Sequence, residues 1–451
     1  MALVVHNNLE NNYKRMKILH TADLHLGQII YQNYDRSDEH QHFFRQLEQW
    51  CKEEQPDALL VSGDVFDIQQ PSATIKKTFT DYFVRLHQQC PHMHIVITAG
   101  NHDSASRIQA DSSVWELANA HLVGTPPAID SLDNYDGWQY NYIIRLDSGY
   151  IVALPYMTGD RRNVIQSILD KVADDNTMRL PVVMMAHQAV TGLDPAGHHF
   201  DIGTLRTLDP SAMGNGYDYL ALGHIHKPQT IGHKEDDNIN TIAAHRSPVV
   251  RYSGSALHVS CDETFPHTVS LVDIDYHQGK VQIQQLRIDE LRHFYVLPSD
   301  GTSFTSADEA LESMTEFVSK GERGYIRFRF DLNTDLPSNF GQMVYDALLP
   351  YNDEWRYNPK MLWTGVSDSK DSEKEELVFE VAELQQMTDP MLFIERTKDQ
   401  YPGLDLEDVR QAFEEVKAEM LLLNEERLRV GELRSGMKEA KNRQKSTPAE
   451  Q

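Results

Sequence analysis

Short apolar runs alternate with amphipathic stretches along the first half of the chain. Five runs are mostly apolar, and they lie at 17–20, 59–62, 94–99, 182–186 and 219–222. Such runs are typical of strands that are buried on both faces. The stretches 39–54 and 72–89 place apolar and aromatic residues at helical spacing. This βαβ alternation predicts a mostly parallel sheet covered by helices.

From about residue 140 the pattern changes to shorter and more closely spaced strands. We expect these strands at 140–146, 150–155, 249–254, 268–276 and 280–287. They would form a second sheet packed on the first, with the last three completing it. The polar segment 233–247 looks like a surface loop. The fold class that follows is α/β, with four layers in the order α/β/β/α.

A second domain begins near residue 290, where the pattern changes again. We expect a linker at 298–301, helices at 307–319 and 339–349, and strands at 325–332 and 376–380. The stretch 404–441 carries an apolar stripe at helical spacing, which predicts one long helix or a helical pair. The expected domains are a disordered extension at 1–15, a main domain at 16–290, a small α+β domain at 291–400 and a helical tail at 401–451.

The net charge is −26, from 42 basic and 68 acidic residues, which argues against binding nucleic acid by bulk electrostatics. No apolar run is long enough for a transmembrane helix, and residues 1–15 do not look like a signal peptide. The three cysteines, Cys51, Cys90 and Cys261, have no metal-type spacing and fit reduced thiols. We therefore expect a cytoplasmic protein that does not associate with membranes.

The five mostly apolar runs all end in residues that can bind a metal ion. Open α/β sheets place their ligands at the carboxyl ends of strands. Taken singly, each of these residues fits a turn, a helix cap or a core histidine, so the recurrence at five strand ends carries the prediction. Oxygen and imidazole donors without a thiolate suit a pair of divalent ions such as manganese, iron or zinc. The residues are Asp23, His25, Asp64, Asn101, His102, His187, His224 and His226, with Asp67 and Asp103 close behind in the sequence.

Other catalytic motifs are missing from the sequence. There is no Gly-x-Ser-x-Gly elbow, and no cysteine lies in a strand-end motif. There is no phosphate-binding Gly-x-x-x-x-Gly-Lys loop either, so any ATP dependence would come from a partner.

The strand-end motifs, in the order D-x-H, GD-x-x-D, GNHD, H and GH-x-H, resemble those of the calcineurin-like metallophosphoesterase superfamily. The fuller motifs are similar to a nuclease branch of that superfamily whose members work with an ATPase subunit. The resemblance covers residues 16 to about 290, although the loop 233–247 looks longer than is usual there. The motifs are His20–Gly27, Gly63–Asp67, Ala99–Ser104, Ala221–Gln229 and Arg251–Ser255.

The resemblance implies a role for each residue. It implies an α/β/β/α fold with two divalent ions, and we expect these to be Mn²⁺. Asp64 would bridge the ions, and His102 would be catalytic, either stabilising the transition state or protonating the leaving oxygen. Asp67 and Asp103 would orient histidines from behind. One ion would be held by Asp23, His25 and His226, and the other by Asn101, His187 and His224.

Three functions stay open at this point. The first is a DNA exonuclease and endonuclease subunit for repair, recombination or replication, acting on ends and hairpins. It would assemble with two copies of an ATPase subunit, form a homodimer through its nuclease domain, use 291–400 as a cap, and dock its 404–441 tail on the partner or fold it back on the cap. The second is a phosphoesterase for nucleotides or other small phosphoesters, which the negative charge favours. The third is a non-enzymatic scaffold, which the complete ligand set disfavours.

Overall fold

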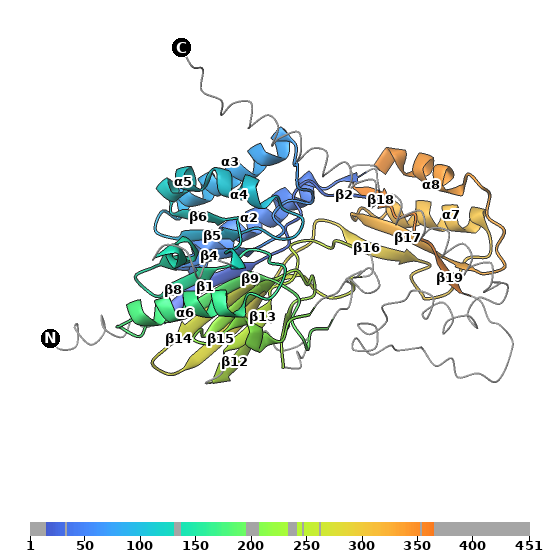
Figure 1. Ribbon diagram of the computed structural model, residues 1–451. Coiled ribbons are helices and arrows are strands. Elements are labelled where there is room, and N and C mark those ends of the chain that lie inside the picture. Colours follow the sequence, from blue (N-terminus) through green and yellow to red (C-terminus); the bar gives the residue numbers. More distant parts are fainter. Residues whose placement is uncertain are drawn as a thin grey trace, which may run out of the picture. The chain divides into compact units, whose positions relative to one another are not determined.

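The structure is a computed structural model (Figure 1). It describes residues 15–31, 34–129, 137–194, 207–232, 248–260, 263–351 and 354–364, and the backbone of 241–245. Residues 1–199 and 207–372 form one compact unit, and all the described residues belong to it. The extension expected at 1–15 (apart from Arg15), the strand at 376–380 and the tail at 404–441 lie outside the described residues.

The first sheet of the main domain combines parallel and antiparallel strands. β1, β4, β5 and β6 are parallel neighbours, whereas β14, β15 and β12 continue the sheet in antiparallel pairing. In pairing order the strands are β12 (Thr241–His245), β15 (Lys280–Arg287), β14 (Thr268–Asp275), β1 (Arg15–Thr21), β4 (Ala58–Ser62), β5 (His94–Thr98) and β6 (Ala120–Val123).

Two long helices cover one face of this sheet, as the helical spacing predicts. Phe43 and Leu47 of α2 (Ser37–Glu54) and Phe83 of α3 (Ala73–Gln89) are buried in one core with residues of β1, β4 and β5. The helix α3 begins where Ser72 accepts a hydrogen bond from the Ile75 amide, an ordinary N-cap. Shorter elements complete this layer, namely α4 (Ala105–Ala110), α5 (Ser112–Trp115) and η1 (Glu116–Ala118).

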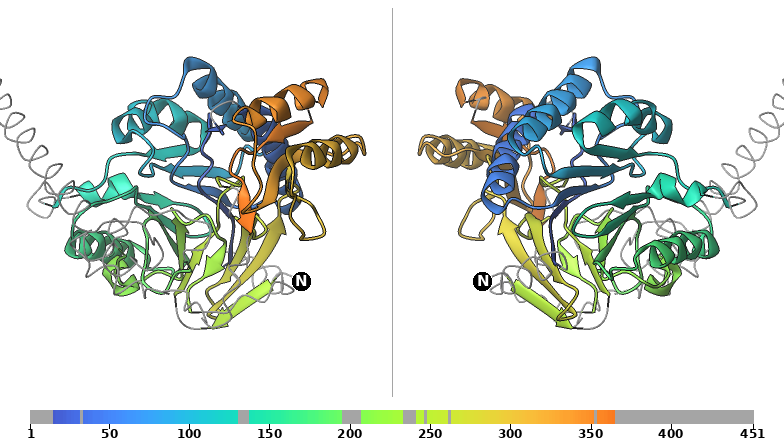
Figure 2. Two further views of the ribbon diagram at one scale, coloured as in Figure 1. Left: turned by 90° about the vertical axis from the view of Figure 1, so that its right-hand side faces the viewer. Right: turned by 90° about the vertical axis from the view of Figure 1, so that its left-hand side faces the viewer.

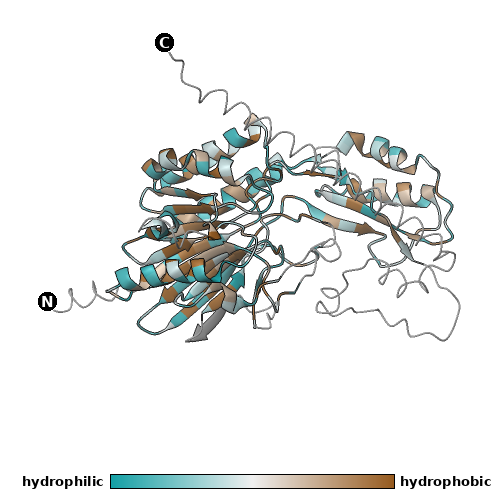
Figure 3. Ribbon diagram, in the orientation of Figure 1, coloured by the Kyte–Doolittle hydropathy of each residue, from teal (hydrophilic) through white to brown (hydrophobic). Residues whose placement is uncertain are grey.

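The second sheet packs against the first, and the helix α6 (Arg162–Asp175) packs on β8 (Figure 2). Hydrogen bonds join the two sheets, from Ser62 Oγ to the Ala221 carbonyl at 3.2 Å and between His20 Nδ1 and the Tyr219 hydroxyl at 2.9 Å. Apolar residues concentrate in the strands of both sheets (Figure 3). The predicted four-layer sandwich is confirmed. In pairing order the second sheet contains β11 (Gln229–Thr230), β13 (Val249–Tyr252), β10 (Tyr219–Gly223), β9 (Val182–His187), β8 (Tyr150–Ala153) and β7 (Ile143–Arg145).

Three predictions about this region were wrong in part. The strands expected at 268–276 and 280–287 belong to the first sheet, where β14 pairs with β1. The strand expected at 140–146 begins as a 3₁₀ helix, η3 (Trp138–Tyr142), because Trp138 and Tyr142 are both buried at a helical spacing of four residues. The loop expected at 233–247 contains the edge strand β12.

The small α+β domain has a parallel sheet and an aromatic core of its own. β16 (His293–Leu297) pairs with β17 (Gly324–Asp331), which also pairs with β18 (Trp355–Tyr357) and β19 (Leu362–Thr364). The linker expected at 298–301 therefore lies inside this domain, between β16 and α7, and that prediction was wrong. The remaining elements are α7 (Ala307–Val318), α8 (Phe340–Leu348), η5 (Leu349–Tyr351), and in the main domain β2 (Ile29–Ile30), β3 (Tyr34–Asp35) and η4 (Pro210–Met213).

Among the helices within the described ranges, none combines the length and hydropathy needed to cross a bilayer.

Candidate metal centre

The site lies where strands of the two facing sheets end. β1, β4 and β5 are parallel neighbours in one sheet, and β9 and β10 are parallel neighbours in the other, so the loops that follow them meet. Ligand-type atoms gather there in three groups, each with its atoms within 4.8 Å of one another. The groups are Asp23, His25 and His226; Asp64, His187 and His224; and His25, Asp67 and His102.

The first group is buried, and its side chains are held from outside. Both carboxylate oxygens of Asp23 lie 3.1 Å from the His224 amide nitrogen. The Nδ1 of His25 lies 3.4 Å from Asp67 Oδ1, so Nε2 of that ring faces the group. Asp67 therefore has the contact predicted for a carboxylate that orients a histidine.

The second group includes Asn101, the one amide among the predicted ligands. Asn101 Oδ1 lies 3.1 Å from His187 Nε2 and 2.9 Å from His224 Nδ1. The other ring nitrogen of His187 donates to the Ser62 carbonyl at 2.8 Å. That bond fixes the tautomer with Nε2 as the free electron-pair donor, which is the usual arrangement at a metal-binding histidine.

Asp64 lies between the two groups. Its Oδ2 is 3.2 Å from His187 Nε2 and 4.0 Å from His25 Nε2, while its Oδ1 accepts a hydrogen bond from the His102 amide at 2.8 Å. A carboxylate that approaches one histidine of each group is placed where a bridging ligand would be.

The backbone is strained at the predicted ligands. Asp23, His25, Asp64 and His224 have positive φ angles of 50°, 45°, 48° and 94°. Such conformations cost residues other than glycine about 1–3 kcal/mol, and they cluster at functional sites. Gly63 is needed beside them, because a Cβ there would lie 2.2 Å from His187 Nδ1.

The electrostatics of the site favour a bound positive charge. Burial opposes ionisation of Asp64, but the neighbouring His187 outweighs it, so the pKa of Asp64 lies well below its ordinary range. The same attraction overcomes burial at His187 and raises its pKa to about 9. Burial raises the pKa of Asp23 to about 7, and nearby histidines offset this only in part. A metal cation could replace the His187 proton as the counter-charge of Asp64.

These residues fit a pair of divalent cations. In the described part of the chain, His25 Nε2 is buried and has no hydrogen-bond partner. An orphaned imidazole nitrogen that faces two carboxylates is costly in a metal-free protein, and a cation would satisfy it. The remaining donors are carboxylate, amide and imidazole groups, which bind first-row divalent ions well.

His102 is exposed at the edge of the site. Its ring centroid lies 4.9 Å from that of His25, and its Nδ1 lies 2.9 Å from the Asp67 carbonyl oxygen. The Nε2 atom can therefore face a substrate. Proximity to His25 and Asp67 would also allow His102 to act as a metal ligand, so its predicted catalytic role stays a prediction.

Asp103 has contacts other than those expected. Its carboxylate accepts hydrogen bonds from the amides of Val65, Phe66 and Gly100, at 3.0, 2.9 and 2.8 Å. We expected Asp103 to orient a histidine, but these bonds fix the backbone of the two loops that present Asp64 and Asn101. No pattern in the sequence pointed to this role, because the amides come from two separate loops.

Glu263 was missed by the sequence reasoning. Its Oε1 lies 2.8 Å from His226 Nδ1, and its Oε2 accepts from the Val259 amide at 2.9 Å. The carboxyl is almost fully buried, and burial raises the pKa of Glu263 to about 7. A carboxylate on Nδ1 leaves Nε2 of His226 to face Asp23 and His25. No motif marks Glu263, since it lies 37 residues from His226.

Comparison with known proteins agrees with this geometry. Residues 16–228 match the calcineurin-like phosphoesterase family. The chain is 30% identical over 290 residues to SbcD of the SbcCD nuclease from Rhodobacter capsulatus, across 57% of this chain and 66% of that protein. It is 29% identical over 325 residues to SbcD from Escherichia coli, across 67% of this chain and 75% of that protein. The SbcD protein of Bacillus subtilis is 28% identical over 282 residues, across 57% and 66%. The chain therefore belongs to the calcineurin-like phosphoesterase family, in the branch of the SbcD nucleases.

Proposed function

We propose that this chain is a metal-dependent nuclease that hydrolyses phosphodiester bonds of DNA at ends and hairpins, as the SbcD-like subunit of a complex with an SbcC-type ATPase. The observation that carries the proposal is the position of Asp64 between two buried groups of ligand-type residues. Such a pair of sites suits the in-line displacement at a phosphate. The names of the curated relatives supply the substrate and the partner.

The roles of the protein side chains follow from their contacts. Asp23, His25 and His226 would hold one ion, Asn101, His187 and His224 the other, and Asp64 would bridge them. When bound, two divalent ions lower the pKa of a water molecule and draw charge from phosphate oxygens. Glu263 and the Ser62 carbonyl keep two of the imidazoles in the tautomer that can bind.

His102 is the proposed catalytic residue. Because its Nδ1 contacts the Asp67 carbonyl, the protonated ring would present Nε2–H to the substrate. This proton can stabilise charge on the phosphate or pass to the leaving sugar oxygen, which is general-acid catalysis. The exposure of His102 leaves it accessible to a polymeric substrate.

The rest of the proposal concerns metal, domains and partners. We take the ions to be Mn²⁺, the domain 291–400 to be a cap over the site, and the tail 404–441 to dock on the ATPase subunit. The complex would contain two copies of each subunit, joined through the nuclease domains, and would act in the cytoplasm. Two divalent ions would add about four positive charges to the site, which offsets locally the net charge of −26.

A digestion assay tests this function. The full chain, freed of metal and then supplied with Mn²⁺, should degrade linear duplex DNA, and an SbcC-type ATPase with ATP should stimulate it. Preferential hydrolysis of nucleotides, with no cleavage of DNA under either condition, would favour the phosphoesterase for small substrates instead.

A truncation tests the docking role of the tail. Removing the residues after Tyr401 should leave Mn²⁺-dependent cleavage of short single-stranded DNA nearly unchanged and abolish ATP-stimulated digestion of duplex ends. Co-purification of the truncated chain with the ATPase subunit at full stoichiometry would show that the tail is not the docking element.

A further inference from the structure

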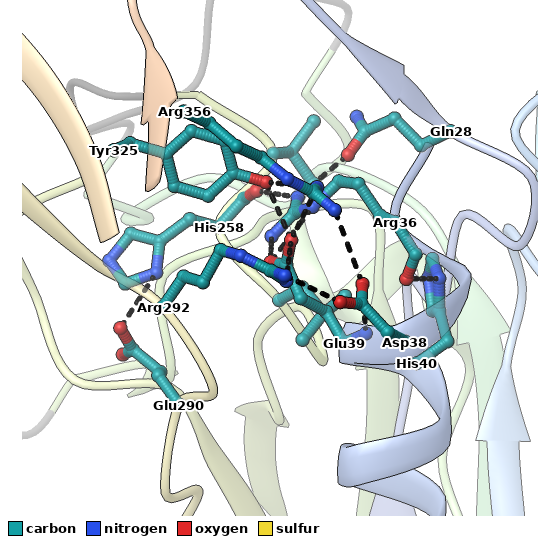
Figure 4. Close-up of polar contacts among 12 residues, drawn as sticks. Gln28, Arg36, Asp38, Glu39, His40, His258, Glu290, Arg292, Tyr325 and Arg356 are labelled. Carbon is teal, nitrogen blue, oxygen red and sulfur yellow. Dashed lines mark hydrogen bonds and ion pairs between the residues drawn. The ribbon is translucent and has the colours of Figure 1, made fainter. Parts of the chain in front are cut away.

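A buried cluster of charged residues lies at the start of α2, where the main domain contacts the small domain (Figure 4). It contains three arginines, two acids and a tyrosine, and we call it the α2 cluster. Burial makes the removal of any single partner costly, because it leaves an uncompensated charge. Its members are Arg36, Asp38, Glu39, Arg292, Tyr325 and Arg356.

On one side, Glu39 binds the small domain. Its Oε1 accepts hydrogen bonds from the Tyr325 hydroxyl at 2.5 Å and from Arg356 Nη1 at 3.1 Å. Arg356 Nη1 also donates to the Tyr325 oxygen at 3.0 Å. The ring of Tyr325 stacks on Phe294 of β16, with centroids 4.7 Å apart. The small domain is thereby attached to Glu39 through two of its strands, β17 and β18.

On the other side, Arg36 binds loops that lead to the metal centre. Glu39 Oε2 accepts from Arg36 Nε at 3.1 Å and from Arg36 Nη2 at 2.6 Å. Arg36 Nη1 donates to Gln28 Oε1 at 2.9 Å and to the His258 carbonyl. One turn along the helix, His40 Nε2 lies 2.8 Å from the Leu24 carbonyl oxygen. The same end of α2 therefore touches the loop after β1 twice and the loop around residue 258 once.

Both loops carry ligands of the first group or their supports. Leu24 lies between Asp23 and His25, and the Gln28 amide donates to the His25 carbonyl at 3.0 Å. The residue after His258 is Val259, whose amide holds Glu263, the partner of His226. A path of hydrogen bonds thus runs from Tyr325 through Glu39 and Arg36 to the supports of that group.

The second group has separate supports. His187 is held by the Ser62 carbonyl, and Asn101 contacts His187 and His224. Within the described ranges, the hydrogen bonds of the α2 cluster reach none of these three residues.

From this asymmetry we propose that Arg36 and Glu39 are positioning residues for one metal ion alone, the ion held by Asp23, His25 and His226. The seating of the small domain on Tyr325 and Arg356 sets the position of Glu39 and Arg36. These in turn set the loops that carry that ion's ligands. The inference rests on the proposed two-metal site and adds that the small domain tunes one half of it.

The test removes one hydroxyl from the path and compares it with a matched hydroxyl outside it. Tyr325→Phe deletes the donor to Glu39. The control is Tyr295→Phe, on the neighbouring strand of the same sheet, whose hydroxyl donates to Glu322 at 2.7 Å. Mn²⁺ is titrated by calorimetry into the metal-free full chain, and thermal unfolding confirms that each variant is folded.

A second layer of variants assigns the two ions. Asn101→Ala removes a ligand of the second group, so the remaining binding reports mainly the first position. His25→Ala does the converse. We expect Tyr325→Phe to weaken Mn²⁺ binding roughly 3- to 10-fold in the wild-type and Asn101→Ala backgrounds, less than the ~10–100-fold typical when a ligand's direct partner is lost. It should have no effect in the His25→Ala background, and Tyr295→Phe should have none in any background.

A further variant guards against a mild phenotype. Arg356→Gln weakens another donor to the same Glu39 oxygen and should shift the same ion. Equal weakening at both positions, or no shift in either variant while the wild-type chain binds two ions, would overturn the positioning role alone. A wild-type chain that binds fewer than two ions would overturn the proposed two-metal site, and this inference with it.

Discussion

Replacing Glu263 by glutamine should weaken the binding of one ion by disturbing His226. Glu263 Oε1 holds His226 Nδ1 at 2.8 Å, and Oε2 holds the Val259 amide at 2.9 Å. Glutamine keeps the shape but replaces one oxygen with an NH₂ donor. If the NH₂ faces Val259, two donors oppose each other. If it faces His226, the ring proton must move to Nε2, the atom that would bind the metal.

The size of the effect follows from the burial of both partners. Glu263 is 2% exposed and His226 7% exposed, so water cannot take over the lost hydrogen bond. An unsatisfied buried donor costs about 1–3 kcal/mol. Loss of an outer partner of a metal ligand typically costs about 10–100-fold in affinity, which is about 1.4–2.7 kcal/mol. The two ranges agree, so we expect a loss of affinity of about 10–100-fold for one ion.

The assay is a calorimetric titration of Mn²⁺ into the metal-free full chain. Glu290→Gln is the matched control, because Glu290 Oε2 lies 3.4 Å from His258 Nδ1 in a similar carboxylate–imidazole pair that touches no predicted ligand. We expect the control to bind both ions as the wild type does. Unchanged affinity in Glu263→Gln, or an equal loss in Glu290→Gln, would refute the reasoning.

Three further predictions follow from the same structure. His102→Ala should keep both ions and lose nuclease activity, because His102 faces the site from its exposed edge; loss of both ions by metal analysis would contradict this. Asp64→Ala should lose both ions, since one carboxylate lies between the two groups, and two ions per chain in the variant would show that Asp64 is not the bridge. Burial opposes ionisation of Glu39, but Arg36 outweighs it and lowers its pKa, so its stabilisation is complete above about pH 4.5 and is lost as the pH falls through the lowered value. Glu39→Gln should therefore unfold at a lower temperature at pH 7, by an amount reflecting about 3–5 kcal/mol, and the gap to the wild type should narrow towards pH 3; thermal midpoints that stay in parallel would refute it.

Local sequence was sufficient for most elements and for the predicted ligands. A buried strand such as β4 and an amphipathic helix such as α3 carry their periodicity within a few residues, so both could be read directly. The predicted ligands could also be found, because residues at the ends of parallel strands lie close together whatever the rest of the fold does. The structure brings Asp23, His25 and His226 together from positions about 200 residues apart in the sequence.

Only the tertiary structure decided the features that depend on pairing between distant segments. The strands β14 and β15 look the same in either sheet, and it is the pairing of β14 with β1 that places them in the first. Glu263 is recognisable only by its contact with His226, because a lone buried carboxylate has no periodicity. The α2 cluster likewise joins Glu39 to Tyr325 across 286 positions. A charged residue at the start of a helix is normally exposed, and only the docked small domain buries this one and provides its partners.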